Sequence, residues 1–180
     1  MKKILFLLFL YSHVFALYID ESLLNIHATL LPKLAFMDSQ YKAKLDKDRL
    51  SIIIFYSKIN YSSAQILQKN IEKKYPHGIK EHPIKLTLLP YRFKQKMQAN
   101  IYYLMPANEK EIKQVVGLAK EEKILTFSYL EENLAQGSTI ALSIGVKVKP
   151  ILNLSALKEC NITIHDVLLK ISTIYQKEIY

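Results

Sequence analysis

Apolar residues recur along this chain with two different spacings, one typical of helices and the other typical of strands. A spacing of three to four residues predicts amphipathic helices over residues 20–36 and 62–75. Continuous or alternating apolar runs of strand length occupy residues 50–56, 84–89 and 100–105. The first of these runs, LSIIIFY, is almost entirely apolar, which is typical of a strand buried on both faces of a sheet. The first half of the chain therefore predicts helices interleaved with strands.

Two local features modify this pattern near the N-terminal end. Pro32 lies inside the first helical pattern, and a proline there removes a backbone donor and clashes with the preceding turn. We therefore expect the helix to kink or to end early at this residue. Residues 38–49 carry seven charged side chains, which predicts a solvated connection.

The next segment adds helix-start and turn signals. Asn108, followed by a glutamate three residues later, is close to a capping box and predicts the start of a helix. A strand is predicted at residues 124–127. Ser128 with Glu131 then fits the S-x-x-E capping box of a short helix, and Gly137 can end that helix in the left-handed conformation.

The C-terminal part predicts a hairpin followed by a last helix. Residues 139–144 and 146–152 have strand patterns joined at Gly145, where the chain can turn tightly. A final helix is predicted from Ile164, with Thr163 as its cap and one apolar stripe. That stripe consists of Val167, Leu168, Ile171, Ile174 and Tyr175.

These elements together predict the fold class. Helices between strands favour parallel crossover connections, whereas the late hairpin adds an antiparallel pair. We therefore expect a single three-layer α/β domain over residues 17–180, with a mixed β-sheet of about six strands flanked by helices. The sequence contains no internal repeat, low-complexity segment or linker that would divide this domain.

Residues 1–16 have the three parts of a secretory signal peptide. Two lysines form the positive start, seven consecutive apolar residues follow, and Val14 and Ala16 supply small residues before a cleavage site. The apolar run is shorter than the roughly 20 residues that span a bilayer. We expect cleavage between Ala16 and Leu17, export to an oxidising compartment and no integral membrane segment after cleavage.

Composition then narrows the classes of function. The chain has 180 residues, a formal charge of +9 and a single cysteine. Cleavage would remove two lysines and no acidic residue, which lowers the charge to +7. One cysteine excludes an intrachain disulfide and a multi-cysteine zinc site, and four glycines leave no glycine-rich phosphate loop. We expect Cys160 to be buried as a small apolar side chain, and His27 to be partly buried and hydrogen-bonded.

Candidate catalytic and metal-binding residues are few. His77, Glu81 and His82 could contact a metal ion, but their spacing matches no closed metal motif and favours solvated loop residues. Cys160 lies five residues before His165, and neither an orienting third group nor a G-x-S-x-G motif accompanies the pair. The sequence therefore predicts that the protein is not an enzyme and that it has no catalytic residue, metal site or cofactor.

A basic stretch with interleaved aromatic residues raises nucleic acid as a partner. It consists of Tyr91, Arg92, Phe93, Lys94 and Lys96. Such interleaving is typical of surfaces that follow a nucleic-acid backbone and stack its bases. Export argues against nucleic acid, because the compartment outside the cytoplasm contains little of it. We therefore expect a basic loop that leads into the third strand, and the alternative is a surface that faces a protein or the anionic headgroups of a membrane.

Three motifs occur in a fixed order in the last third of the chain. Residues 123–128 are KILTFS, Asn153 and Leu154 follow the hairpin, and residues 162–169 begin the last helical pattern. This order resembles the YfiR-like family of periplasmic proteins, whose members have an I-L-T-v-S strand, an I-N-L step and an L-x-I-S-S-x-L-L helix start. The resemblance extends over residues 20–176 and is closest in the last 55.

The chain departs from the family pattern at several positions. Pro150 stands in the return strand of the hairpin, where it cannot donate to a ladder, so we expect an edge or a bend there. Asn161 replaces the usual glycine between the last two helices, and asparagine tolerates the left-handed region. Some members carry stabilising disulfides that this chain cannot form.

The resemblance implies regulation rather than catalysis. Characterised relatives are periplasmic repressors that bind the sensor domain of an inner-membrane diguanylate cyclase and keep its output, cyclic-di-GMP, low. The implied partner is such a cyclase or a sensor kinase, and a homodimer is also compatible with this role. One alternative is a small-molecule binder whose cleft lies beyond the carboxyl ends of the strands, in the loops after Tyr56, Met105 and Phe127. A hydrolase is a weaker third hypothesis.

Overall fold

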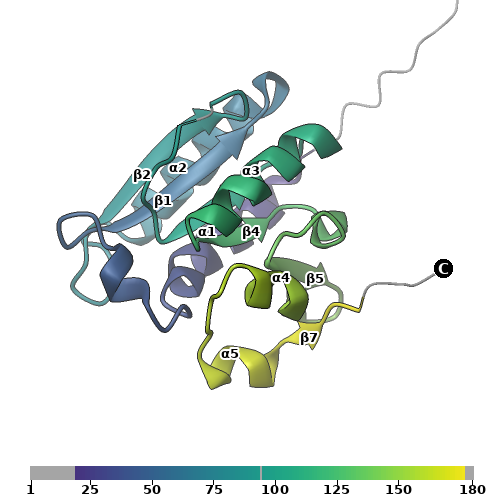
Figure 1. Cartoon of the computed structure of the whole chain (residues 1–180). Helices are drawn as coiled ribbons and strands as arrows, with labels where there is room; N and C mark the ends of the chain where they lie inside the picture. Colours follow the sequence, from purple (N-terminus) through teal and green to yellow (C-terminus); the bar gives the residue numbers. More distant parts are fainter. Residues whose placement is uncertain (1–18, 94, 177–180) are drawn as a thin grey trace, which may run out of the picture.

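The computed structural model describes residues 19–93 and 95–176, in which seven strands form one sheet with helices on both faces (Figure 1). The strands are β1 (Leu50–Tyr56), β2 (Ile84–Pro90), β3 (Ile101–Leu104), β4 (Leu125–Ser128), β5 (Ile140–Ile144), β6 (Val148–Leu152) and β7 (Thr173–Ile174). The α-helices are α1 (Glu21–Ala35), α2 (Tyr61–Lys74), α3 (Glu109–Glu121), α4 (Leu154–Glu159) and α5 (Asp166–Ile171). Short 3₁₀ helices occur at η1 (Tyr41–Lys44), η2 (Lys58–Asn60) and η3 (Glu131–Leu134).

Parallel strands make up most of the sheet. The order is β2-β1-β3-β4-β5-β6-β7, and the first five strands in this order are parallel to one another. Strand β6 is antiparallel to β5, and β7 is parallel to β6. The predicted α/β fold with a mixed sheet is therefore confirmed. The described residues contain one strand more than the expected six, because Thr173 and Ile174 pair with Ile151 and Leu152.

Strand β1 shows how the three layers are held together. Ile52 and Ile54 belong to the apolar cluster that contains α1 and α2, whereas Ile53 and Phe55 belong to the cluster that contains α3. All four side chains are at most 2% exposed. Successive residues of a strand point to opposite faces, so a strand covered on both sides needs a continuous apolar run. The sequence LSIIIFY meets this requirement, as predicted.

Several local predictions are confirmed by the backbone. The side chain of Asn108 caps α3 by accepting a hydrogen bond from the backbone N–H of Glu111 (3.0 Å). Gly137 follows η3 with a φ of +98°, and Asn161 lies between α4 and α5 with a φ of +52°. Both residues therefore adopt the positive φ that glycine and asparagine tolerate best. Pro150 lies in β6 beside Leu142 of β5, and β7 pairs only with the two residues that follow it, so the outer side of Pro150 is unpaired within the sheet.

Helix α1 does not end early at Pro32. The helix continues to Ala35, and Pro32 is buried within its last turn. A proline near the C-terminal end removes one intrahelical hydrogen bond. Burial of Leu31 and Leu34, which are at most 4% exposed, offsets that loss because each apolar side chain contributes about 2 kcal/mol.

The capping box predicted at Ser128 and Glu131 is wrong. Ser128 is the last residue of β4 and is fully buried, and its hydroxyl donates a hydrogen bond to Oγ of Ser138 (2.7 Å). The helix that follows is the four-residue η3, preceded by Leu130 without a side-chain cap. The hydroxyl is therefore hydrogen-bonded to the segment that precedes β5 and does not cap a helix.

The prediction of a long C-terminal helix is also wrong. Helix α5 spans only six residues, begins after His165 without a side-chain cap, and ends where Ser172 adopts an extended conformation. The next two residues form β7, and the N–H of Tyr175 donates to the carbonyl of Leu152 (2.8 Å). Pairing with β6 therefore outweighs the helical spacing of the apolar residues.

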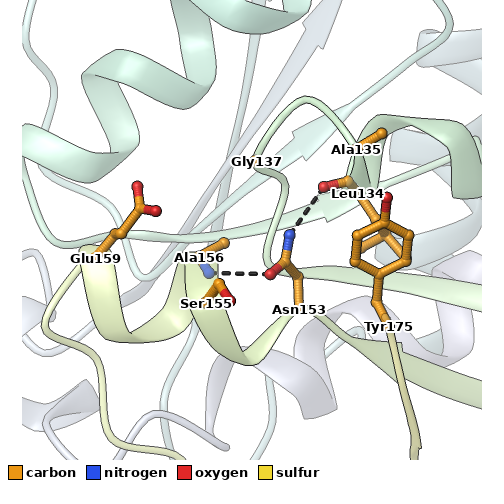
Figure 2. A pocket seen from close by; sticks show the side chains of 8 residues that line it. All are labelled: Leu134, Ala135, Gly137, Asn153, Ser155, Ala156, Glu159 and Tyr175. Atoms are coloured by element: carbon orange, nitrogen blue, oxygen red, sulfur yellow. Dashed lines mark hydrogen bonds between the residues drawn. The ribbon is translucent and has the colours of Figure 1, made fainter. Parts of the chain in front are cut away.

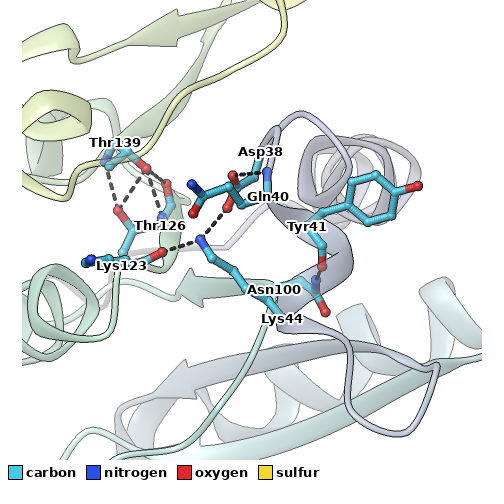
Figure 3. A network of polar contacts seen from close by, with 8 residues as sticks. All are labelled: Asp38, Gln40, Tyr41, Lys44, Asn100, Lys123, Thr126 and Thr139. Atoms are coloured by element: carbon cyan, nitrogen blue, oxygen red, sulfur yellow. Dashed lines mark hydrogen bonds and ion pairs between the residues drawn. The ribbon is translucent and has the colours of Figure 1, made fainter.

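The charged segment 38–49 is not fully solvated. Asp38 is 1% exposed, and its carboxylate forms an ion pair with Lys44, whose ammonium also donates to the carbonyl of Lys123 (Figure 3). The amide of Asn100 donates to the carbonyl of Tyr41 (2.8 Å). These contacts fasten the segment containing η1 to the amino ends of β3 and β4.

Candidate interaction surfaces

The loops at the carboxyl ends of β1 and β3 are joined by a buried asparagine. Asn60 is 8% exposed, and its Nδ2 donates to the carbonyl of Pro106 (2.6 Å) and to Oγ of Ser57 (3.1 Å). Two of the three loops expected to line a small-molecule cleft are therefore bonded to each other. The space between them contains the Asn60 side chain.

A small cavity lies between η3, α4 and the residue that follows β7 (Figure 2). Its volume is about 150 Å³, and Leu134, Asn153, Glu159 and Tyr175 are among its lining residues. Asn153 organises one wall, because its Nδ2 donates to the carbonyl of Leu134 (2.8 Å) and its Oδ1 accepts from the N–H of Ala156 (3.0 Å). Pockets for drug-sized ligands usually measure about 300–1,000 Å³, so this cavity suits only a very small molecule or water.

The residues considered as metal ligands, His77, Glu81 and His82, do not form a metal-binding group in the described parts of the chain. Nδ1 of His82 lies 3.0 Å from the backbone carbonyl of Asp48, and its ring lies beside those of Phe36 and Tyr41. Within the described ranges no group of three or more His, Cys, Asp or Glu side chains is arranged to hold a metal ion. His82 instead contacts the loop before β1.

His27 and Cys160 are core residues. His27 is fully buried, its Nδ1 is hydrogen-bonded to the hydroxyl of Tyr103 (2.8 Å), and its ring stacks on Phe127. Burial lowers the pKa of His27 from 6.5 to about 3, so the ring is neutral in the folded protein. Cys160 is 4% exposed, and burial raises the pKa of its thiol, which keeps it protonated and unreactive. The predicted burial of Cys160 is confirmed, and His27 is hydrogen-bonded as predicted but fully rather than partly buried.

Exposed apolar side chains gather in the last part of the fold. Of the ten large hydrophobic residues that are exposed in the described parts of the chain, eight lie between Ile144 and Ile174. We call the following six the C-terminal apolar residues: Ile144, Val146 and Val148 of the β5–β6 hairpin, and Val167, Ile171 and Ile174 of α5 and β7. Helix α5 contacts β6, and β7 pairs with β6, so the elements that carry them are neighbours.

The sequence pattern did not predict this group of exposed residues. Val167, Ile171 and Ile174 belong to the apolar stripe predicted for a long last helix, and all three are exposed. Groups of exposed apolar residues commonly mark interaction sites. The one sequence feature that indicates exposed apolar residues here is Val146, because an apolar residue beside the tight turn of a hairpin projects from the sheet.

Comparison with known proteins identifies the family. The YfiR/HmsC-like family matches this chain over residues 25–173, which covers both halves of the sheet. The chain belongs to the YfiR/HmsC-like family. The resemblance found in the last third of the sequence is therefore confirmed for most of the chain. No curated protein matches it.

Two solved structures share the fold at low sequence identity. The first is a conserved domain protein from Vibrio cholerae, with 16% identity, a TM-score of 0.59 and 84% of this chain covered. The second is the ABC domain in complex with L-Trp from Streptococcus pneumonia, with 12% identity, a TM-score of 0.51 and 78% of this chain covered. The YfiR/HmsC-like chain spans 59% of the first structure and 60% of the second.

The predicted cleavage residues Ala16 and Leu17 lie outside the described residues, and so does Lys94 of the basic stretch. Among the helices that are described, none is both long and apolar enough to cross a bilayer.

Proposed function

We propose that this protein is an exported, non-enzymatic regulator that binds the periplasmic sensor domain of an inner-membrane diguanylate cyclase and represses it. The observation that carries this proposal is the YfiR/HmsC-like family match over residues 25–173. The C-terminal apolar residues support it, because a soluble protein gains by covering such side chains with a partner.

Repression requires a difference in affinity between two states of the partner. A protein that binds the inactive and active states of the cyclase equally well shifts nothing, however tight the binding. The regulator must therefore bind the inactive state more tightly. A tenfold preference supplies about 1.4 kcal/mol toward repression.

A crosslinked pull-down from the native cell envelope tests the proposal. The tagged full-length protein is expected to capture one membrane diguanylate cyclase, and deletion of its gene is expected to raise cyclic-di-GMP. A version that lacks residues 2–16 is the matched control, since it should stay in the cytoplasm and capture no periplasmic domain. An envelope without a captured signalling protein, together with an unchanged cyclic-di-GMP level, would contradict the proposal. Capture of a sensor kinase instead would keep the regulatory role and replace the target.

A second candidate function is the binding of a small molecule without a protein target. It is favoured by the fold shared with the pneumococcal domain whose structure contains L-Trp. The cavity beside Asn153, at about 150 Å³, is too small for a drug-sized ligand, so such a ligand would need a wider and more open pocket, such as the one of about 560 Å³ lined by Ser143, Ile151 and Ile174. L-Trp would raise the melting temperature of the purified protein under this hypothesis, and the envelope pull-down would yield no signalling protein.

A further inference from the structure

Strand β2 is a long edge of the sheet. It has seven residues and, within the described parts of the chain, pairs only with β1. Its side chains from Ile84 to Leu89 are half-buried, whereas every residue of β3 and β4 is buried. The opposite edge of the sheet, β7, is only two residues long. The outer side of β2 is therefore the larger open edge.

The backbone of β2 presents alternate residues to the outside. The N–H of Leu50 donates to the carbonyl of Pro83, and the N–H of Tyr91 donates to the carbonyl of Tyr56. In a parallel ladder, every second residue directs both its N–H and its C=O to the same neighbour. The odd-numbered residues 83–91 therefore face β1, and the N–H and C=O groups of Ile84, Leu86 and Leu88 face outward.

The usual devices that protect a sheet edge are weak along β2. Proteins blunt their edges with charges, prolines, bulges or short strands. The single charge within β2 is Lys85, whose ammonium is occupied by the carboxylate of Asp46 (2.7 Å). Pro90 lies at the last position, beyond the three outward-facing residues. The rest of the edge is open to another strand.

A groove next to this edge provides space for alternate side chains of an added strand. It has a volume of about 320 Å³ and lies between the end of α2 and β2, with Ile71, Tyr75, Ile84 and Leu86 in its wall. Strand addition combines main-chain hydrogen bonds, which supply affinity, with such pockets, which supply specificity.

The charge around β2 indicates which kind of segment fits. Residues 66–96 contain eight lysine and arginine residues and two acidic ones, so most of the chain's net positive charge is concentrated here. Lys73 and Lys74 are exposed in the helical turn that borders the groove, next to Glu72. A second copy of this chain would bring two basic regions together, whereas an acidic segment would be attracted.

We propose that the outer edge of β2 binds an extended segment of a protein partner that carries acidic side chains, and that this segment adds to the sheet as a strand. The identity of the partner rests on the proposed function, in which it belongs to the repressed signalling protein. In this arrangement Ile84, Leu86 and Leu88 of β2 exchange hydrogen bonds with the partner's backbone. Acidic side chains of the partner at the rim of the groove lie near Lys73 and Lys74.

Two pairs of variants test this proposal in the envelope pull-down. Leu86→Pro removes an outward N–H and leaves the ladder to β1 intact, and Leu86→Ala is its control because it keeps the N–H. We expect Leu86→Pro to lower recovery of the signalling protein about tenfold and Leu86→Ala to lower it much less. Lys73→Gln with Lys74→Gln should lower recovery about fivefold at low salt, whereas Lys110→Gln with Lys158→Gln, an equal charge change on α3 and α4, should not.

Folding and assembly are controlled in the same samples. Circular dichroism and thermal melting verify that each variant is folded, and the lysine pairs keep the test decisive if Leu86→Pro does not fold. Undiminished capture by folded Leu86→Pro, or by the Lys73 and Lys74 variant, would overturn the β2 proposal and leave the proposed function intact. A wild-type protein that captures no signalling protein would overturn both. A wild-type dimer that Leu86→Pro converts to a monomer would assign the edge to a second copy and also overturn the proposal.

Discussion

His27 is a titratable side chain in the core, without an acidic partner to stabilise its charged form. Its ring contacts Tyr103, Phe127 and Tyr129, all of which are uncharged at neutral pH, and Nε2 has no hydrogen-bond partner among the described residues. Protonation inside the fold would place an unpaired charge in an apolar cluster. Acid should therefore act on stability through this residue.

The first prediction concerns the pH dependence of unfolding. The pKa of His27 is about 3 in the folded protein and 6.5 when unfolded, so the unfolded state takes up a proton between these values and stability falls as pH falls below 6.5. Between pH 7 and pH 5 this residue should remove roughly 2 kcal/mol from the free energy of unfolding. Urea denaturation at both pH values should show a smaller loss for His27→Gln than for the wild type.

His165→Gln is the matched control for this measurement. His165 is exposed at the start of α5, so its removal should leave the wild-type difference between pH 7 and pH 5 unchanged. The same pH dependence in His27→Gln as in the wild type would show that other groups cause the acid sensitivity.

A second prediction concerns the buried ion pair in Figure 3. Asp38 is 1% exposed and its partner Lys44 is 13% exposed, so Asp38→Asn leaves a largely buried ammonium without its carboxylate. Removing one member of such a pair should lower the free energy of unfolding by about 3 kcal/mol. Lys113→Gln, which breaks the exposed pair with Glu109, should cost less than about 1 kcal/mol in the same urea titration. Similar costs for the two variants would contradict the structural role assigned to Asp38.

Strands β4 and β5 share fewer paired residues than any other neighbouring strands in the described sheet. The two strands share one register pair, Phe127 with Ile140, whereas β3 and β4 share four. Hydroxyl groups supply further contacts, since Oγ1 of Thr139 accepts from the N–H of Thr126 (2.8 Å) and donates to its carbonyl (2.7 Å). Side chains therefore complete a connection that the backbone ladder leaves short.

Thr139→Val gives the third prediction. Valine has nearly the same shape but no hydroxyl, so it leaves the buried N–H and C=O of Thr126 without these partners. We expect a loss of about 2 kcal/mol in the free energy of unfolding and faster hydrogen exchange at the Thr126 amide. Thr163→Val, at an exposed position, should change stability by less than about 0.5 kcal/mol. An unaltered Thr126 amide in Thr139→Val would contradict the bridging role.

The elements that the sequence predicts well are those whose pattern matches their surroundings. The strands at 50–56, 84–89 and 100–105 agree with β1, β2 and β3 within one residue at each end. Burial on both faces of β1 and β3 requires apolar residues at successive positions, whereas the alternating pattern of β2 suits a half-buried strand at the edge of the sheet. The sequence fails where two elements compete for one residue. Ser128 suits a helix cap as well as a strand end, and only the position of Ser138 decides between them.

The interaction surfaces were harder to predict because they depend on what each element leaves uncovered. Ile171 has the same chemistry on a buried stripe as on an exposed helix, and its exposure follows from the early end of α5. The pattern around Leu86 predicts a strand whether that strand lies inside the sheet or at its edge. Its place at the edge follows from the strand order. A single sequence contains the pattern and not the order of the strands.

At the scale of the whole molecule, the proposed function requires the protein to reach the periplasm. The fourth prediction is that the exported protein begins at Leu17, because small residues at positions 14 and 16 suit the cleavage site of a secretory signal peptide. Intact-mass measurement of protein purified from the periplasm should therefore show a chain of residues 17–180. Ala16→Leu should block cleavage and leave the precursor in the membrane fraction, since a large side chain does not suit the last position before the cleaved bond.

Ala16→Gly is the matched control, because glycine is also small and should be processed normally. Wild-type protein that keeps its first 16 residues would contradict the predicted cleavage, and protein found only in the cytoplasm would exclude contact with a periplasmic sensor domain. Cleavage at a different bond would move the boundary and preserve export. Export therefore decides whether the outer edge of β2 and the C-terminal apolar residues can reach the periplasmic domain of a membrane partner.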